Sequence, residues 1–354
     1  MYLKRAGFAA CLAMATLALL AGCGQKQSTS QTSGGGVKPF RAGLAVDIAG
    51  VDDKSFNAAS WAGLQRADSD LNLGPDGVRY IGSKTPSDYE PNLAAFASQG
   101  YDVVFAGSFS FEDALASVAP QFPKVKFAII DGNAPSLPNC EALHFHEEQS
   151  SFLAGYLAAA VSKKKTIGFV GGMEIPLIKK FEAGYRVGAK TADPNVKVIA
   201  TYTGDWDDVS KGKTQAQQEF GNGADIIFQA AGKSGLGVIE AAKEMGPGYY
   251  AIGVDSDQDD IAPGRVLTSV LKRVDVATYD TIKRTKDGSF TPGTEVYDLK
   301  SGGVGLSDMK YTKQDVPPAV LKNLDTLKQM IIDGKLTPPT TLDAVASFAP
   351  PKLQ

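Results

Sequence analysis

Short apolar runs, each bounded by glycine or a charged residue, recur along most of this 354-residue chain and constrain its fold more than any other feature. Segments with helical periodicity fit between nearly all of them. A strand that is apolar throughout is buried on both faces, which is typical of a parallel sheet covered by helices. The pattern therefore predicts a doubly wound α/β fold. The nine expected strands lie at 41–47, 78–83, 101–107, 126–132, 166–172, 196–204, 224–232, 249–255 and 265–272.

Two lobes are expected, because nine strands exceed the roughly five to six of an average sheet and the chain exceeds the size at which one core stops growing. We expect lobe 1 to comprise residues 39–142 plus 256–288. Lobe 2 is expected to comprise residues 143–255 plus 289–345, so the chain would cross between the lobes three times.

The first 22 residues have the features of a signal peptide. Lys4 and Arg5 form a positive start, and the uncharged stretch 8–20 is too short to span a bilayer. Leu-Ala-Gly-Cys at 20–23 matches the bacterial lipobox, in which the Cys23 thiol receives a lipid. The alternative is that Cys23 is an ordinary residue after a standard cleavage site.

Residues 23–38 are predicted to be a lipidated cysteine followed by a flexible linker. The tract is rich in Gly, Ser and Gln and has no branched apolar residue before Val37. Acylation would anchor the protein to a bacterial membrane, facing the periplasm or the exterior, without crossing the bilayer. Of the other cysteines, Cys11 leaves with the signal peptide and Cys140 remains alone, so no intrachain disulfide is expected.

Charge excludes one class of partner. The formal net charge of -3 on a chain with 36 basic and 39 acidic residues gives no electrostatic footprint for nucleic acid.

Polar residues or glycine follow several of the predicted strands. In open α/β sheets, ligands bind beyond the carboxyl ends of the strands, which selects these residues as a candidate site. Any single Asp in such a place is also explained as a turn former or helix cap. The residues are Asp47, Asp131, Gly232, Asp255 and Lys272.

The segment 46–64 is the densest motif, because it joins a strand end, an acidic turn and a Ser-Phe-Asn step that opens a helix. Ser55 or Asn57 could cap that helix, and Phe56 could pack on the core. Alternatively, Phe56 presents the flat face of its ring at the edge of a cleft, and the side-chain amide of Asn57 both donates and accepts hydrogen bonds there.

Several segments together resemble the basic membrane lipoprotein family, also called PnrA-like or Med-like. The similarity extends over roughly residues 40–335, and the family comprises substrate-binding lipoproteins of nucleoside ABC importers. It implies a type I periplasmic-binding fold with two lobes and a three-segment hinge. The segments are 46–64, FAIIDG, VGGMEIPLIKKFEAGYRVGAK, YTGDWDDVSKGKTQAQ, GADIIFQAAGKSGLGV, GVDSDQ and VLTSVLKRVD.

The resemblance also implies a set of ligand-binding residues. In this sequence Asp131 falls at the position that reads the base, while Asp255 and Lys272 fall at the positions that bind ribose. Trp206 stands where the family commonly has Phe. The full implied set is Asp47, Ser55, Phe56, Asn57, Asp131, Trp206, Gly232, Asp255 and Lys272.

The chemistry of these residues suits a nucleoside. Phe56 and Trp206 could sandwich a base, and each stacking contact contributes on the order of 1–3 kcal/mol. Asn57 and Asp131 can pair with polar edges of a purine. Asp255 and Lys272 would bind ribose hydroxyls and also satisfy each other's charge. The candidate residues include no cluster of basic side chains that would bind a phosphate.

Three further motifs give only weak evidence for a functional site. Gly232-Lys233-Ser234 lacks the upstream glycine of a phosphate loop, because Ile227 stands there. His144 and His146 alternate on a strand beside Glu147 and Glu148, but no third metal ligand is placed, so neither metal nor cofactor is expected. Gly171-Gly172 is interpreted as a tight turn.

The leading hypothesis is a monomeric binding protein that closes on a purine nucleoside (inosine, adenosine or guanosine) and delivers it to an ABC permease with its ATPase subunits. A sugar or another small polar solute is the alternative ligand. A nucleoside hydrolase is the rival class, but the acidic residues at 52, 53, 205, 207 and 208 lack a recognisable ligand spacing, so we do not expect an enzyme. A sensor for a signalling partner would share the same site.

Overall fold

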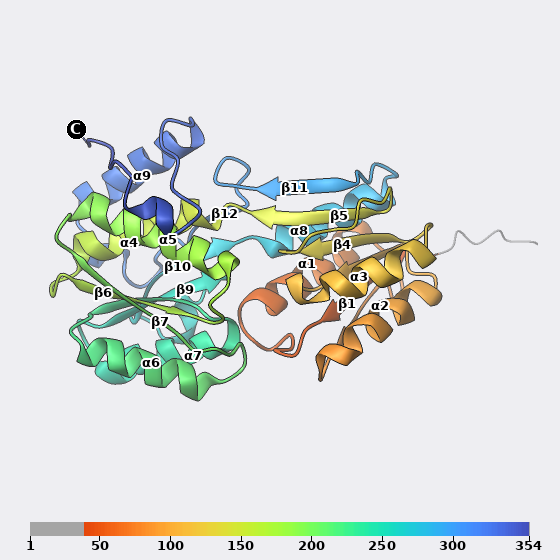
Figure 1. Cartoon of the computed structure of the whole chain (residues 1–354), viewed down its shortest axis with the longest axis horizontal. Coiled ribbons are helices and arrows are strands. Elements are labelled where there is room, and N and C mark those ends of the chain that lie inside the picture. Colours follow the sequence, from red (N-terminus) through yellow and green to blue (C-terminus); the bar gives the residue numbers. More distant parts are fainter. Residues whose placement is uncertain (1–38, 354) are drawn as a thin grey trace, which may run out of the picture. The chain divides into compact units, whose positions relative to one another are not determined.

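The computed structural model describes residues 39–353, which form two α/β lobes, each built on a six-stranded sheet (Figure 1). The predictions for residues 1–38, including the signal peptide, lipidation of Cys23 and the linker, lie outside the described residues. The nine predicted strands are all present, and all but one of the strand pairings are parallel. The α/β prediction is therefore confirmed.

Lobe 1 has the strand order β11-β5-β4-β3-β1-β2. Helices α1 (Phe56–Leu71) and α8 (Val274–Lys286) contribute to the hydrophobic cluster on one face, and α2 (Tyr89–Ser98) and α3 (Glu112–Val118) to the cluster on the other. The strands are β1 (Ala42–Val46), β2 (Val78–Gly82), β3 (Val103–Ala106), β4 (Lys126–Ile130), β5 (Cys140–Phe145) and β11 (Gly293–Tyr297).

Lobe 2 repeats this arrangement with the order β12-β10-β9-β8-β6-β7, in which β12 is antiparallel to β10. One face carries α4 (Glu147–Val161), α5 (Pro176–Ala192) and α9 (Pro318–Ile332), and the other carries α6 (Val209–Gly221) and α7 (Gly235–Met245) (Figure 1). The strands are β6 (Thr166–Gly171), β7 (Lys197–Tyr202), β8 (Ile226–Ala230), β9 (Tyr250–Asp255), β10 (Val266–Lys272) and β12 (Val304–Leu306).

The chain passes between the lobes at three places, between β5 and α4, between β10 and α8, and between β11 and β12. These crossings differ from the expected boundaries. Strand β10 lies in lobe 2, because it pairs in parallel with β9, although 256–288 was assigned to lobe 1. Strand β11 lies in lobe 1, because it pairs with β5, although 289–345 was assigned to lobe 2.

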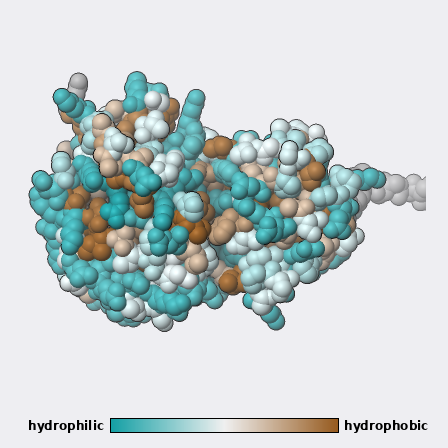
Figure 2. Space-filling view, in the orientation of Figure 1, coloured by the Kyte–Doolittle hydropathy of each residue, from teal (hydrophilic) through white to brown (hydrophobic). Residues whose placement is uncertain are grey.

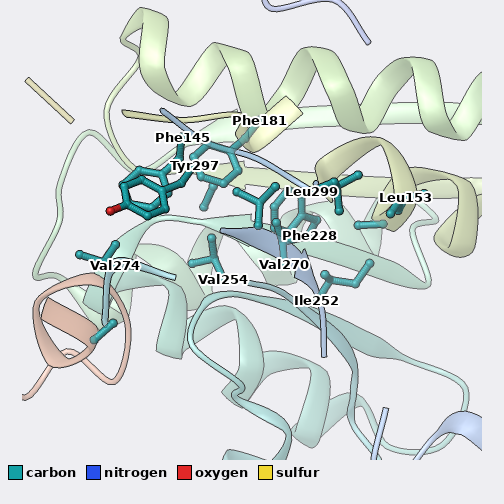
Figure 3. Close-up of a cluster of buried hydrophobic side chains, with 14 of the residues drawn as sticks. Phe145, Leu153, Phe181, Phe228, Ile252, Val254, Val270, Val274, Tyr297 and Leu299 are labelled. Carbon is teal, nitrogen blue, oxygen red and sulfur yellow. The ribbon is translucent and has the colours of Figure 1, made fainter. Parts of the chain in front are cut away.

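The hydrophobic core continues from one lobe into the other beside these crossings. Phe145 of β5 and Tyr297 of β11 stack with ring centroids 5.3 Å apart. Figure 3 shows this pair next to Phe181 of α5. The two lobes therefore share a well-packed core beside the crossings.

The face of the molecule in Figure 2 is mostly hydrophilic, with hydrophobic areas on lobe 2 and where the lobes meet. Among residues 39–353, no helix is both long and apolar enough to cross a bilayer. Cys140 is a buried free thiol in β5.

Candidate functional site

A cavity lies between the lobes at the carboxyl ends of the strands, as the strand-end rule predicts. Its empty volume is about 590 Å³, including space open to solvent. Eight of the nine predicted ligand-binding residues line it, and Ser55 is fully buried beside it. The eight are Asp47, Phe56, Asn57, Asp131, Trp206, Gly232, Asp255 and Lys272.

Asp53, not Ser55 or Asn57, caps helix α1. Its carboxylate accepts hydrogen bonds from the backbone N–H groups of Ser55 (3.0 Å), Asn57 (2.8 Å) and Ala58 (2.9 Å). The capping interpretation of the Ser-Phe-Asn step is therefore wrong, and both polar side chains are free for other contacts. Asn57 Nδ2 donates to Asp47 Oδ1 at 2.9 Å, and Ser55 Oγ donates to Asp255 of the other lobe.

Burial changes the acidity of these carboxyl groups. It raises the pKa of Asp47, although hydrogen bonds from Asn57 and the Ala49 backbone, and the nearby Ser108 hydroxyl, partly offset the rise. It also raises the pKa of Asp255 to about 7, against the opposing effects of the Lys272 charge and the Ser55 hydroxyl. Burial therefore makes both carboxyl groups harder to ionise in the folded protein, despite the hydrogen bonds that they accept.

Lys272 is the centre of a buried charge network that joins the lobes. Its ammonium binds Asp131 of lobe 1, and it lies 2.8 Å from Glu147 at the start of α4. Lys180 of α5 binds the second oxygen of Glu147 and donates to the Phe145 carbonyl at 2.8 Å. Burial opposes ionisation of Glu147, but the two ammonium groups outweigh it and lower the pKa of Glu147.

The expected mutual pairing of Lys272 with Asp255 is thus replaced by pairs with Asp131 and Glu147. The physical reason is the first crossing between lobes, which brings the start of α4 beside the end of β10. Asp255 is influenced by Lys272 only through its charge, and its direct partner is Ser55.

The two predicted aromatic residues come from opposite lobes. Phe56 begins α1 in lobe 1, and the Lys272 ammonium lies 5.3 Å from the centre of its ring. Trp206 lies in the loop between β7 and α6, with its ring pressed against Gly172. A Cβ atom on Gly172 would lie 2.3 Å from a ring carbon of Trp206. Gly172 is therefore needed for close packing of Trp206, beyond the tight turn predicted for it.

Two acids at equivalent places in the lobes have left-handed backbone conformations. Asp131 follows β4 with φ of 60°, and Asp255 ends β9 with φ of 63°. A residue other than glycine is uncommon in this region, although Asp and Asn tolerate it better than most. Such local strain is concentrated at functional sites, and both residues line the cavity.

Comparison with known proteins agrees with this geometry. The family described as "ABC transporter substrate-binding protein PnrA-like" (Bmp) matches residues 42–335. The chain belongs to the Bmp family.

Relatives in the Bmp family include the "ABC transporter nucleoside-binding protein BmpA" of Lactococcus lactis subsp. cremoris, which is 37% identical and aligns over 95% of this chain and 99% of its own. "Basic membrane protein A1" of Borrelia garinii subsp. bavariensis is 34% identical over 84% of this chain and 88% of its own. Among solved structures, an ABC transporter solute-binding protein from Aeropyrum pernix K1 has a TM-score of 0.80 and 28% identity, covering 87% of this chain and 96% of that one. This Bmp-family chain is accordingly a substrate-binding protein of an ABC transporter and has the fold of the periplasmic binding proteins.

Several lining residues of this Bmp-family cavity were not predicted. Ser108 and Phe109 follow β3, so the strand-end rule applied to the run 101–107 could have identified them. Outside the lining, Glu147 contacts Lys272 and Lys180 contacts Glu147, and no sequence signal connects these three residues. Apolar residues of α5 complete the lining, namely Leu177, Ile178 and Phe181.

The two histidines have protein partners. His144 Nε2 lies 2.9 Å from the Gly132 carbonyl, and His146 Nδ1 lies 2.7 Å from Glu148. Within residues 39–353, no group of three or more His, Cys, Asp or Glu side chains is arranged to hold a metal ion.

Proposed function

We propose that this chain binds a purine nucleoside in the cavity between its lobes and delivers it to an ABC permease. The observation that carries the proposal is the pair of aromatic side chains from opposite lobes, Phe56 and Trp206, in one cavity with several buried carboxylates. The printed name of the Lactococcus relative, a nucleoside-binding protein, supports the same ligand class.

The aromatic pair accounts for the base. When the lobes close, a flat base between Phe56 and Trp206 is desolvated on both faces, and each stacking contact contributes on the order of 1–3 kcal/mol. Gly172 supports this arrangement, because the absence of a side chain lets the Trp206 ring pack closely against the end of β6.

The carboxylates account for the polar atoms of the ligand. Asp47, Asp131 and Asp255 accept hydrogen bonds, and a nucleoside offers ribose hydroxyls together with N–H groups on the base. Lys272 is committed to Asp131 and Glu147, and it is the cation among the described lining residues. A phosphate would therefore face uncompensated negative charge, which favours nucleosides over nucleotides.

Titration calorimetry on the mature chain tests the ligand class, with inosine, adenosine, guanosine and ribose as the four ligands. We expect the nucleosides to bind and ribose to bind far more weakly. Binding of ribose with no binding of any nucleoside would replace the proposal with the sugar alternative. Release of hypoxanthine from inosine during the experiment would contradict a binding protein and indicate a hydrolase.

We also propose that Cys23 carries a lipid that anchors the protein to a bacterial membrane, facing the periplasm or the exterior. Cys23→Ser should abolish incorporation of labelled fatty acid and release the chain from membranes, because the lipobox acts through that thiol. Continued labelling of the variant would place the anchor elsewhere.

A further inference from the structure

Ser108 presents a buried hydroxyl group to the cavity, beside the carboxyl group of Asp47 but with no hydrogen bond of normal geometry to it. The residue follows β3, lines the cavity and is 4% exposed. Among residues 39–353, its Oγ has no hydrogen bond of normal geometry. Leaving a buried hydroxyl without a hydrogen bond destabilises a folded protein.

Local structure does not explain the hydroxyl. Ser108 occupies the N-terminal cap position of the short turn Phe109–Phe111, but its side chain makes no capping hydrogen bond. Its backbone is extended, with φ of -162° and ψ of 172°, so the residue type is not required by the conformation. The hydroxyl is therefore available to a ligand.

The position of Ser108 in the sheet is the place where a ligand is expected. The strand order of lobe 1 reverses direction at β1 and β3, which are direct neighbours. Gly107 N–H donates to the Ala45 carbonyl at 2.9 Å, which extends the pairing of the two strands as far as Ser108. Ligands of open α/β sheets bind at this switch point, and Asp47, the residue after β1, lies beside Ser108.

Most polar groups on the lobe 1 wall are acceptors. Asp47 and Asp131 are carboxylates, and one N–H of Asn57 is already donated to Asp47. Lys272, the cation that faces this wall, donates to Asp131. The hydroxyl of Ser108 lies near the Asp47 carboxyl without a hydrogen bond of normal geometry, so it can turn to another acceptor, and a purine ring carries nitrogen acceptors that need a donor.

We propose that Ser108 is a specificity-determining residue whose hydroxyl donates a hydrogen bond to a ring nitrogen of the purine base. The inference rests on the proposed nucleoside function. It adds to that function the group that recognises an acceptor on the base, as distinct from the carboxylates that recognise donors.

Ser108→Ala tests the assignment. We expect the affinity for inosine to fall about 3- to 10-fold, the value of one net hydrogen bond, while the melting temperature of the free protein stays equal or rises. Ser151→Ala is the matched control, because Ser151 of α4 is also fully buried with an unbonded hydroxyl but does not line the cavity. Ser151→Ala should leave the melting temperature equal or raised, as expected for Ser108→Ala, but its affinity for inosine should equal that of the intact protein.

Two analogues identify the ligand atom, 7-deazainosine and 3-deazainosine, which each replace one ring nitrogen by C–H. In the intact protein, we expect one of them to bind about 3- to 10-fold more weakly than inosine, and in Ser108→Ala that difference should vanish. An unchanged affinity of Ser108→Ala, or an equal loss for all three ligands, would overturn the role of Ser108. If the intact protein binds no purine nucleoside at all, the proposed function itself fails.

Discussion

The two lobes share one strand order but contribute different chemistry to the cavity between them. Lobe 1 supplies most of the polar side chains, namely Asp47, Asp53, Asn57, Ser108 and Asp131. Lobe 2 supplies a largely apolar wall of Leu177, Ile178, Phe181, Trp206, Ala230 and Val254, with Asp255 and Lys272 as its charged residues. Under the proposed function, lobe 1 would therefore hydrogen-bond most of the polar atoms of the ligand, while the apolar wall of lobe 2 would exclude water and strengthen those hydrogen bonds.

The largest expected effect comes from Lys272→Met, which removes the lobe 2 cation that balances Asp131 of lobe 1. Asp131 would remain as a buried carboxylate without its ion-pair partner, and Glu147 would keep only its ion pair with Lys180. Breaking a buried ion pair from one side costs about 3–5 kcal/mol, so the free energy of unfolding in urea should fall by that amount. Lys213→Met is the control, because Lys213 pairs with Glu240 and Glu244 on the surface, and it should leave stability nearly unchanged. Equal stability of the two variants would mean that lobe 1 does not depend on the lobe 2 cation.

The next effect concerns the pH dependence of stability. Burial raises the pKa of Asp255 to about 7, and the charged groups that act on it are Lys272, Asp53 and Asp131. Between about pH 4 and pH 7 the unfolded chain loses this proton while the folded protein keeps it, so the contribution of Asp255 to stability decreases as pH rises. Asp255→Asn should flatten this decrease by on the order of a few kcal/mol between pH 4 and pH 8.

Urea denaturation at several pH values measures that slope. Glu219→Gln is a control from the same lobe, because burial raises the pKa of Glu219 to about 8 and Glu219 does not line the cavity. It should also flatten the stability curve but leave ligand affinity unchanged, whereas Asp255→Asn should weaken binding. An unaltered slope in Asp255→Asn would mean that the carboxyl is ionised at low pH in the folded protein.

Trp206→Ala tests the apolar wall. The loss of one stacking contact should weaken nucleoside affinity about 5- to 150-fold in calorimetry, with a smaller loss of stability than the 3–5 kcal/mol typical of a core tryptophan. The second tryptophan provides the control, because Trp61 packs edge-on against Tyr80 at 5.0 Å and does not line the cavity. Trp61→Ala should lower the melting temperature without changing affinity. The reverse result would place Trp206 in the core instead of the site.

The smallest effect is expected from Gly172→Ala. The added methyl group would meet the Trp206 ring at 2.3 Å, so the ring must shift and affinity should fall by less than in Trp206→Ala. Gly82→Ala is the control, because nothing lies within 4 Å of a Cβ at the end of β2. If Gly172→Ala binds as tightly as the intact protein, the position of the Trp206 ring does not matter for the ligand.

Sequence alone predicted nine of the strands and eight of the seventeen residues that line the cavity. Local patterns identified the strands and their polar ends, and the family resemblance added Phe56, Asn57 and Trp206. An apolar run followed by Asp or Gly marks a buried strand and its ligand-facing end, which identified Asp47, Asp131 and Asp255. Strands β5, β11 and β12 were not among the nine, since CEALHF of β5 interrupts its apolar residues with Glu and His, GTEVY of β11 is a largely exposed edge strand and β12 has only three residues. Their partners also decide the lobe boundaries, which explains why those boundaries were misplaced.

Contacts between distant segments could not be predicted. Glu147 meets Lys272 only because the first crossing places α4 beside β10, and the two residues are far apart in the sequence. The capping role of Asp53 was local but ambiguous, because Asp53, Ser55 and Asn57 are all good capping residues. Only the three-dimensional arrangement separates the cap from the two site residues.

The three crossings also determine the order in which the protein can fold as it emerges in one direction, from a ribosome or through a membrane pore. The lobe 1 sheet lacks its final strand until residue 297 is available, and β11 must then pair with β5 about 150 residues earlier in the chain. Lobe 2 begins before lobe 1 is complete and ends after it. Neither lobe can therefore finish as an independent unit, and a chain that is still emerging stays open and unfinished until nearly all of it has passed through.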